Sequence, residues 1–251
     1  MKKSYLPGET LSRKEVELIV NAINHSKVQY KEWANERNLG FSNGKYLDRW
    51  NYIFANIRDS FNYEPFKVFS IKRGTLWEFA VIYNTGTKIL YLLLREDNFK
   101  RIKEGNDNAY HYIRVLNSKN SQTKIDTRTQ ISMFPKTEVA SDNYINEDLE
   151  NMLLSIKDEV KGCRNIVFTE NKNGVIRISE NIANYHLDII DSFDLTKYIT
   201  ADIENISDTQ NENVESHPVI ELKIRQDKMK SKKDDIISGE DKKDKKDEED
   251  L

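Results

Sequence analysis

Few residues in this chain combine the types and spacing that a chemical reaction needs. The segment VIELKIR contains Glu221 and Lys223, which lie on the same side of an extended strand because they are two residues apart. With Asp191 or Asp202 as an upstream acid, Glu221 could hold Mg²⁺ while Lys223 orients an attacking water. Because this spacing is common in charged chains, we favour an edge strand or an interaction segment here.

The other candidates for catalysis or metal binding are isolated in the sequence. The histidines, at positions 25, 111, 186 and 217, have no second ligand at the spacing of a zinc site. No glycine-rich phosphate loop and no nucleophile elbow is present. We therefore expect a protein that is not an enzyme and needs no cofactor. A metal-dependent nuclease, with Mg²⁺ as its cofactor, is the alternative.

Length and composition favour a folded part joined to a part that does not fold. The chain has 251 residues, of which 37% are hydrophobic and 32% are charged, a low apolar share for a globular protein. The longest apolar run, residues 89–94, is too short to span a bilayer, and no signal peptide precedes it. The single cysteine, Cys163, is expected as a buried apolar residue in a cytoplasmic protein without membrane partners.

The first 116 residues predict helices followed by an antiparallel sheet. Apolar spacing indicates three packed helices: one behind the capping box of Ser12 and Glu15, one over 27–39, and one over 50–61. Strands are expected over 66–71, 76–83 and 88–95, with NTGT as a hairpin turn. A short helix over 97–105 and a strand over 110–116 complete this region.

The rest of the chain divides into three parts. Residues 117–145 form a polar loop, and 146–206 complete the domain with a helix, a hairpin turning at Asn173 and Gly174, and a final helix or strand over 185–199. Residues 207–251 are rich in charge and poor in apolar residues, so we expect a disordered tail. The predicted fold class is α+β.

Basic residues favour the first half of the chain as a nucleic-acid contact. Residues 1–140 carry 23 Lys and Arg against 15 Asp and Glu, whereas the remainder carry 16 against 27. The two halves can attract each other or bind separate partners. We expect Arg49, Arg58, Arg73 and Arg95 to contact phosphates. The alternative is that these residues are solvated, with Arg95 packing on the sheet beside Trp77.

One apolar pentapeptide interrupts the polar loop. Gln130, Ile131, Ser132, Met133 and Phe134, followed by Pro135, resemble the peptide through which bacterial polymerases and repair proteins dock on the DNA sliding clamp. The resemblance implies that Met133 and Phe134 enter a pocket of the clamp while Gln130 forms hydrogen bonds at its edge. Alternatively, Ile131 and Phe134 anchor the loop on its own domain, or the segment forms a short strand.

A wider resemblance covers residues 1–200. YLDRWNYI, IKRGTLWEFAVIYNTGTKILYLLLREDNF, HYIRVLN and QISMF are similar, in that order, to an uncharacterised domain family of low-GC Gram-positive bacteria and their mobile elements, such as plasmids. No activity follows from this resemblance.

Three hypotheses are consistent with these patterns. The first is an accessory protein of DNA transactions, from a mobile element or from phage defence, that docks on the clamp. The second is an abortive-infection effector that degrades or blocks nucleic acid. The third is a toxin or antitoxin partner whose acidic tail binds a basic protein.

Overall fold

A computed structural model describes residues 10–38, 41, 43–73, 77–105, 110–120 and 140–199. The chain divides into two units, Met1–Asn205 and Ile206–Leu251, and all the described residues belong to the first. The pentapeptide 130–134 and the Glu221 and Lys223 pair lie outside the described residues. A functional site can therefore be described only on the sheet and the helices around it.

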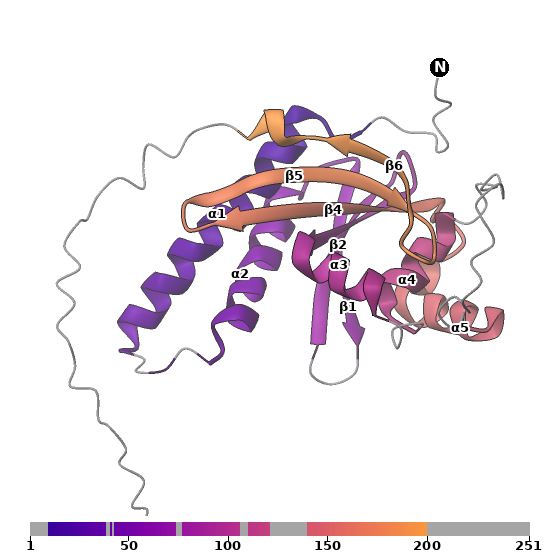
Figure 1. The fold of residues 1–251 in the computed structure, drawn as a ribbon, viewed down its shortest axis with the longest axis horizontal. Coiled ribbons are helices and arrows are strands. Elements are labelled where there is room, and N and C mark those ends of the chain that lie inside the picture. The colour runs from indigo at the N-terminus through magenta and orange to yellow at the C-terminus, as the bar shows by residue number, and fades with distance from the viewer. Residues whose placement is uncertain are drawn as a thin grey trace, which may run out of the picture. The chain divides into compact units, whose positions relative to one another are not determined.

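Six strands form one sheet in the order of the sequence, β1-β2-β3-β4-β5-β6 (Figure 1). Their bounds are Phe66–Arg73 for β1, Trp77–Asn84 for β2, Ile89–Arg95 for β3, Gly162–Asn171 for β4, Gly174–Ala183 for β5 and Ile189–Asp194 for β6. Neighbouring strands are antiparallel except β3 and β4, which are parallel. A parallel pair needs a crossover connection, and the chain from Glu96 to Lys161 supplies it.

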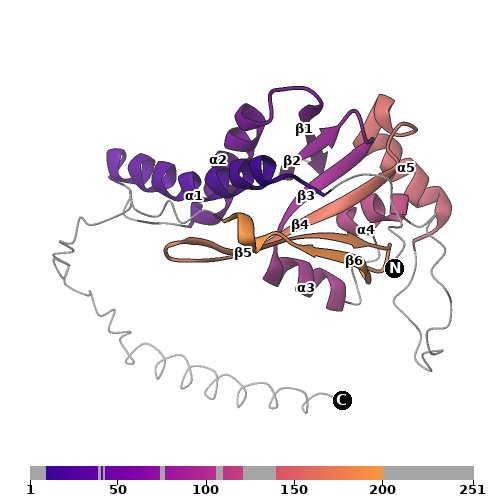
Figure 2. The same ribbon diagram turned by 90° about the horizontal axis from the view of Figure 1, so that it is seen from above.

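Helices cover both faces of the sheet (Figure 2). On one face lie α1 (Arg13–Glu36) and α2 (Lys45–Ser60), and on the other lie α3 (Glu96–Glu104), α4 (Tyr112–Asn117) and α5 (Asp142–Leu153). Short 3₁₀ turns occupy Ser118–Asn120, Leu154–Ile156 and Thr196–Tyr198. No described helix is long and apolar enough to cross a membrane. The predicted α+β class is confirmed.

Two hydrophobic clusters, one on each face, hold these layers together. Successive residues of a strand point to opposite faces, so β4 sends Ile166 and Phe168 toward α1 and α2 and sends Cys163 and Val167 toward the other helices. The capping box at the start of α1 is confirmed, since the Ser12 backbone N–H donates to Glu15 Oε2 at 2.6 Å.

The N-terminal region contains two helices where the sequence predicted three. Residues 12–39 were expected as two helices, but α1 is a single helix of 24 residues. No glycine or proline interrupts it, and Ser26 extends the buried stripe from Ile23 to Tyr30. The Ser26 hydroxyl donates to the Ile23 carbonyl at 2.6 Å, which satisfies this polar group within the packed face.

The predicted strand over 110–116 is wrong, because these residues contain α4. Residues 113–117 are all buried, so no alternation between two faces exists to favour a strand. His111 starts the helix, with its Nδ1 accepting a hydrogen bond from the Ile113 backbone N–H at 3.3 Å. The undecided segment 185–199 contains strand β6 and a 3₁₀ turn.

The hairpin predicted at Asn173 and Gly174 is confirmed. Gly174 has a φ of 144°, a conformation that glycine adopts at low cost. The register of β4 with β5 shifts between Thr169 and Glu170. As a result Val175 is buried, and Ile176, which the shift leaves without a partner on β4, is 50% exposed.

Cys163 provides a simple test of the packing. Its side chain is 0% exposed, and burial raises the pKa of the thiol above its ordinary value. We expect the native protein to react very slowly with a thiol-specific disulfide reagent, because the thiolate is the reactive form. Protein unfolded in guanidinium should release one equivalent at once, and equally fast labelling of native protein would contradict the packing.

Candidate functional site

The carboxyl ends of the parallel strands bring distant residues together. In the register of β3 with β4, Arg95 lies opposite Phe168, so Glu96 at the start of α3 becomes a neighbour of Thr169. The Thr169 hydroxyl donates a hydrogen bond to Glu96, and the next residue on β4 is Glu170. Two carboxylates from segments far apart in the sequence therefore mark this end of the sheet.

Basic side chains surround the carboxylate of Glu170 on the face of the sheet that α1 and α2 cover. Arg49 donates two hydrogen bonds of 2.6 Å, one to each carboxylate oxygen, and Lys27 lies 3.2 Å from Oε2. Arg95 is more distant, at 3.9 Å from Oε1. Burial alone would raise the pKa of Glu170, but Arg49 and Lys27 outweigh this effect and hold the pKa below its ordinary value. Glu170 is thus a buried, ionised anchor between α2 and β4.

Glu96 plays the corresponding part on the opposite face. Lys100, one turn later on α3, lies 2.8 Å from Glu96 Oε1, and Arg177 of β5 lies 3.9 Å from the same oxygen. Hydrogen bonds from Lys100 and Thr169 hold the pKa of Glu96 below its ordinary value. The carboxylate links α3 to β4 and β5, and basic groups surround it.

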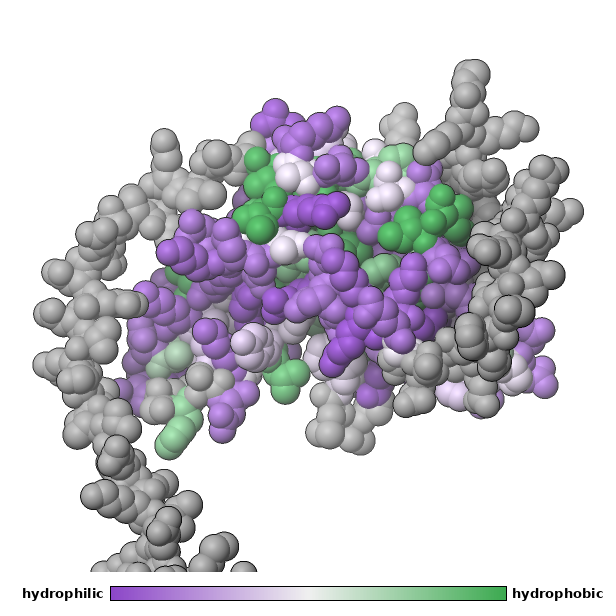
Figure 3. All heavy atoms as spheres, in the orientation of Figure 1, coloured by the Kyte–Doolittle hydropathy of each residue, from purple (hydrophilic) through white to green (hydrophobic). Residues whose placement is uncertain are grey.

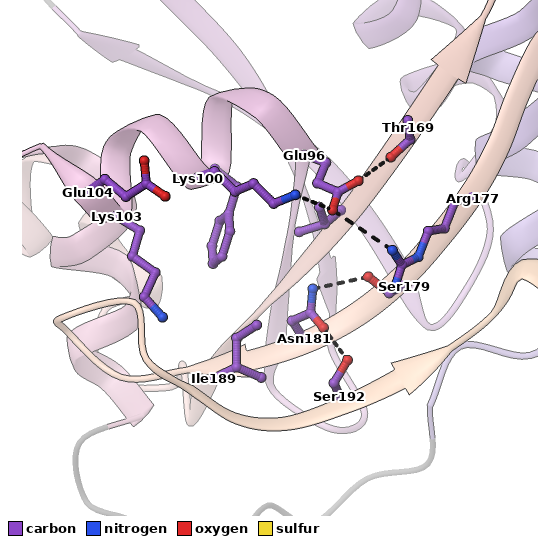
Figure 4. Close-up of a pocket in the computed structure, with 12 residues that line it drawn as sticks. Glu96, Lys100, Lys103, Glu104, Thr169, Arg177, Ser179, Asn181, Ile189 and Ser192 are labelled. Atoms are coloured by element: carbon purple, nitrogen blue, oxygen red, sulfur yellow. Dashed lines mark hydrogen bonds and ion pairs between the residues drawn. The ribbon is translucent and has the colours of Figure 1, made fainter.

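An open pocket lies between α3 and the strands β4, β5 and β6 (Figure 4). We call it the α3 pocket, and its volume is 390 Å³. Its lining comprises three basic side chains, Lys100, Lys103 and Arg177, two acidic ones, Glu96 and Glu104, four polar ones, Thr169, Ser179, Asn181 and Ser192, and three apolar ones, Phe99, Val167 and Ile189. Its volume lies within the range of small-ligand sites, and its lining is mostly polar.

Asn181 organises the polar wall of the pocket. Its side chain is 4% exposed, and its amide nitrogen donates to Ser179 Oγ at 3.1 Å. Its amide oxygen accepts a hydrogen bond from the Ser192 hydroxyl. A side-chain amide has two N–H donors, and one of them has no partner among the described residues. The wall therefore presents a donor to whatever enters.

The helix that carries the basic residues is held by a buried arginine. Arg114 of α4 is 1% exposed and donates to the carbonyl oxygens of Ile102, at 2.8 Å, and Lys103, at 3.1 Å. These carbonyls belong to the last turn of α3, where a cation is favourable. Burial lowers the pKa of Arg114 from its ordinary value. Arg114 thereby fixes the end of α3 that carries Lys103.

The four arginines predicted to contact phosphates do not form one surface. Arg49 and Arg95 meet at Glu170, whereas Arg58 is exposed on α2 beside Asp59. Arg73, at the end of β1, forms an ion pair with Asp148 of α5. Trp77 is half-buried against the cluster on the second face, which matches the packing alternative.

Several residues of the α3 pocket were missed at the sequence level. They include Lys100, Lys103, Arg177, Ser179 and Asn181. One signal could have revealed part of the set: Arg177, Ser179 and Asn181 alternate with Ile178 and Ile182 along β5, although Glu180 interrupts the apolar positions. Such alternation indicates a strand with one face open to polar contacts. The α3 residues gave no comparable signal, because mixed charge is ordinary on a short exposed helix.

The arrangement is suited to binding an anion with polar substituents. Hydrophilic residues cover most of the face of the molecule that includes α3 (Figure 3). Within the described ranges, no group of three or more His, Cys, Asp and Glu side chains could hold a metal ion. The basic groups of the pocket can attract an anion, and its carboxylates, hydroxyls and amide can hydrogen-bond polar substituents.

Replacing Arg49 tests whether Glu170 is a structural anchor. Arg49→Gln removes the paired hydrogen bonds and leaves Glu170 buried with only Lys27 and the distant Arg95, so we expect a loss of about 3 kcal/mol of unfolding free energy. Chemical denaturation monitored by circular dichroism measures it. Arg58→Gln, at an exposed pair, should change stability far less. Equal effects of the two substitutions would contradict the assigned role.

Comparison with known proteins gives a family and no activity. A search of curated proteins and a search of solved structures each found no match to the chain. A family model described as a family of unknown function (DUF5986) matches residues 8–239. The match confirms the expectation of an uncharacterised domain family and extends beyond the expected residue 200. The chain therefore belongs to this family of unknown function.

Proposed function

We propose that this protein is a non-enzymatic accessory protein of DNA transactions, which contacts nucleic acid at the carboxyl ends of β3 and β4 and docks on the sliding clamp through residues 130–134. The observation that carries the nucleic-acid part is the α3 pocket with Lys100, Lys103 and Arg177 at its edge. The clamp part rests on the pentapeptide sequence. A mobile element or a phage-defence system is the proposed setting.

The exposure of the basic side chains supports the nucleic-acid part. The side chains of Lys100, Arg177 and Lys103 are 63%, 64% and 41% exposed, respectively, although each is within 4.0 Å of a carboxylate. Exposed pairs of this kind contribute only about 0–1 kcal/mol, so these cations can also bind a phosphate while their carboxylates remain beside them. Arg49 and Arg73 are less suitable, because buried carboxylates already hold them.

The clamp part draws support from how the chain enters and leaves the segment that contains the pentapeptide. Before it, the Asn120 side chain donates to the carbonyls of Cys163 and Ala183, each at 2.7 Å. After it, the Ala140 backbone N–H donates to the Tyr185 hydroxyl at 3.0 Å. Both flanks are thus attached to the sheet region, and a peptide inserted between fixed flanks suits recognition by a preformed pocket.

Loss of two basic side chains should weaken binding to nucleic acid. We expect Lys100→Gln/Arg177→Gln to lower the affinity for a labelled oligonucleotide and to flatten its salt dependence by about 0.7–0.9 in log–log slope for each phosphate that the variant no longer neutralises. Fluorescence anisotropy at several salt concentrations measures both. Lys161→Gln/Lys67→Gln, two exposed lysines elsewhere on the sheet, is the control with matched charge. Identical losses in the two double variants would refute the assigned surface.

Alteration of the pentapeptide should abolish docking on the clamp. We expect purified clamp to retain the wild-type protein and to release Gln130→Ala/Phe134→Ala, because these side chains supply the edge hydrogen bonds and an apolar anchor. Lys124→Ala/Lys136→Ala, in the same segment, controls for general charge. Retention of the pentapeptide variant at the wild-type level would end the clamp hypothesis. Mg²⁺-dependent degradation of nucleic acid in these assays would instead support the nuclease alternative, which Glu221→Ala then tests.

A further inference from the structure

We propose that the α3 pocket receives the terminal nucleotide of a strand that ends in a phosphate monoester, and that it does not bind the diester backbone of a continuous strand. This inference rests on the proposed contact with nucleic acid and specifies which part of the nucleic acid the pocket recognises. Three observations carry it: ion pairs join α3 to the sheet at both ends of the pocket, its lining has a net positive charge, and its remaining lining suits a sugar and a base.

Two ion pairs join α3 to the sheet, one at each end of the pocket. At the end near the β4–β5 hairpin, Arg177 of β5 lies 3.9 Å from Glu96 of α3. At the other end, Lys103 of α3 lies 3.6 Å from Asp188, in the turn between β5 and β6. A continuous strand needs a groove that is open in both directions, whereas side chains bridge this pocket of 390 Å³ at both ends. Such a volume suits one small ligand.

The lining carries three basic and two acidic side chains, and this net charge of +1 attracts a phosphate monoester more strongly than a diester. A monoester carries between about 1.5 and 2 negative charges at neutral pH and has three acceptor oxygens, whereas a diester carries one charge. Lys100, Lys103 and Arg177 come from two elements on opposite sides of the pocket. A small dianion between them can accept from donors on both sides, and charge-assisted bonds of this kind are the stronger class.

The other lining residues can bind chemical groups that inorganic phosphate lacks. Asn181, nine-tenths buried, has a second amide N–H, and the carboxylate of Glu96 can accept hydrogen bonds from hydroxyl or amino groups. Ile189 is 49% exposed at the edge, and Phe99 and Val167 lie beneath. An apolar surface beside polar groups matches a nucleobase joined to a sugar. A terminal nucleotide supplies the anion, the hydroxyls and the flat apolar ring together.

Binding of matched oligonucleotides to the full chain tests the inference. One short single strand is prepared with a 5′-phosphate, with a 3′-phosphate and with hydroxyls at both ends, and each carries the label at an internal base. We expect one phosphorylated form to bind about tenfold more tightly than the hydroxyl form, which corresponds to about 1.4 kcal/mol. A free nucleoside monophosphate should compete with that form. Inorganic phosphate at the same concentration should compete poorly.

Substitutions in the pocket locate the effect. Lys103→Gln and Arg177→Gln should each remove most of the preference for the phosphorylated strand, whereas Lys161→Gln, at the opposite end of β4, should retain it. Thermal melting confirms that each variant is folded. A preference that survives in both pocket variants would overturn the assignment to this pocket.

The different failures are distinguishable. Equal binding of all three strands would overturn the terminal-nucleotide inference and leave the proposed nucleic-acid contact standing. Absence of binding to every strand would overturn both. Tight binding of the free nucleoside monophosphate with no binding of any strand would overturn the strand as the source of the nucleotide and would support the same pocket as a receptor for a small nucleotide.

Discussion

Strands β3 and β4 are parallel neighbours. The chain must therefore return from the end of β3 to the opposite edge of the sheet before β4 can begin. The crossover from Glu96 to Lys161 contains α3, α4 and α5, which supply the second hydrophobic layer. The pairing also fixes where the two strands end. Glu96 and Thr169 become neighbours only because Arg95 and Phe168 share a register, so the α3 pocket is a direct consequence of this one pairing.

Buried amides hold the crossover against the strand that it reaches. The side chains of Asn117 in α4 and Asn165 in β4 exchange hydrogen bonds of 3.1 Å and 2.9 Å, and Asn120 bonds to the backbone of β4 and β5. Unpaired buried amides are costly, whereas a satisfied network specifies one arrangement. Asn165 lies opposite Asn181 in the sheet register. The same network that fixes α4 therefore borders the strand position that supplies the polar wall of the pocket.

Local signals predicted much of the fold, and the missing parts depend on contacts between distant segments. The capping box of α1, the NTGT turn, the Asn173 hairpin and α3 follow from residues close in sequence. The strand expected over 110–116 failed because a short helix buried on all sides shows no periodicity of its own. No local sequence pattern indicated the parallel pairing of β3 with β4. The site was harder still, since Glu170 acquires its main partners from α1 and α2, Arg177 from α3 and Asn181 from β6, all distant in the sequence.

Charge distribution along the sequence has a different meaning once the fold is known. The first half is rich in Lys and Arg and the second in Asp and Glu, and the structure pairs them: Arg49 with Glu170, Arg73 with Asp148, and Lys88 with Glu159. Much of the basic surplus is therefore used within the fold and is no measure of affinity for nucleic acid. What distinguishes a basic residue as a contact for an external anion is its exposure. By that criterion Lys100, Lys103 and Arg177 are better candidates than Arg49 and Arg73, because their side chains are much more exposed and water screens their pairing with carboxylates.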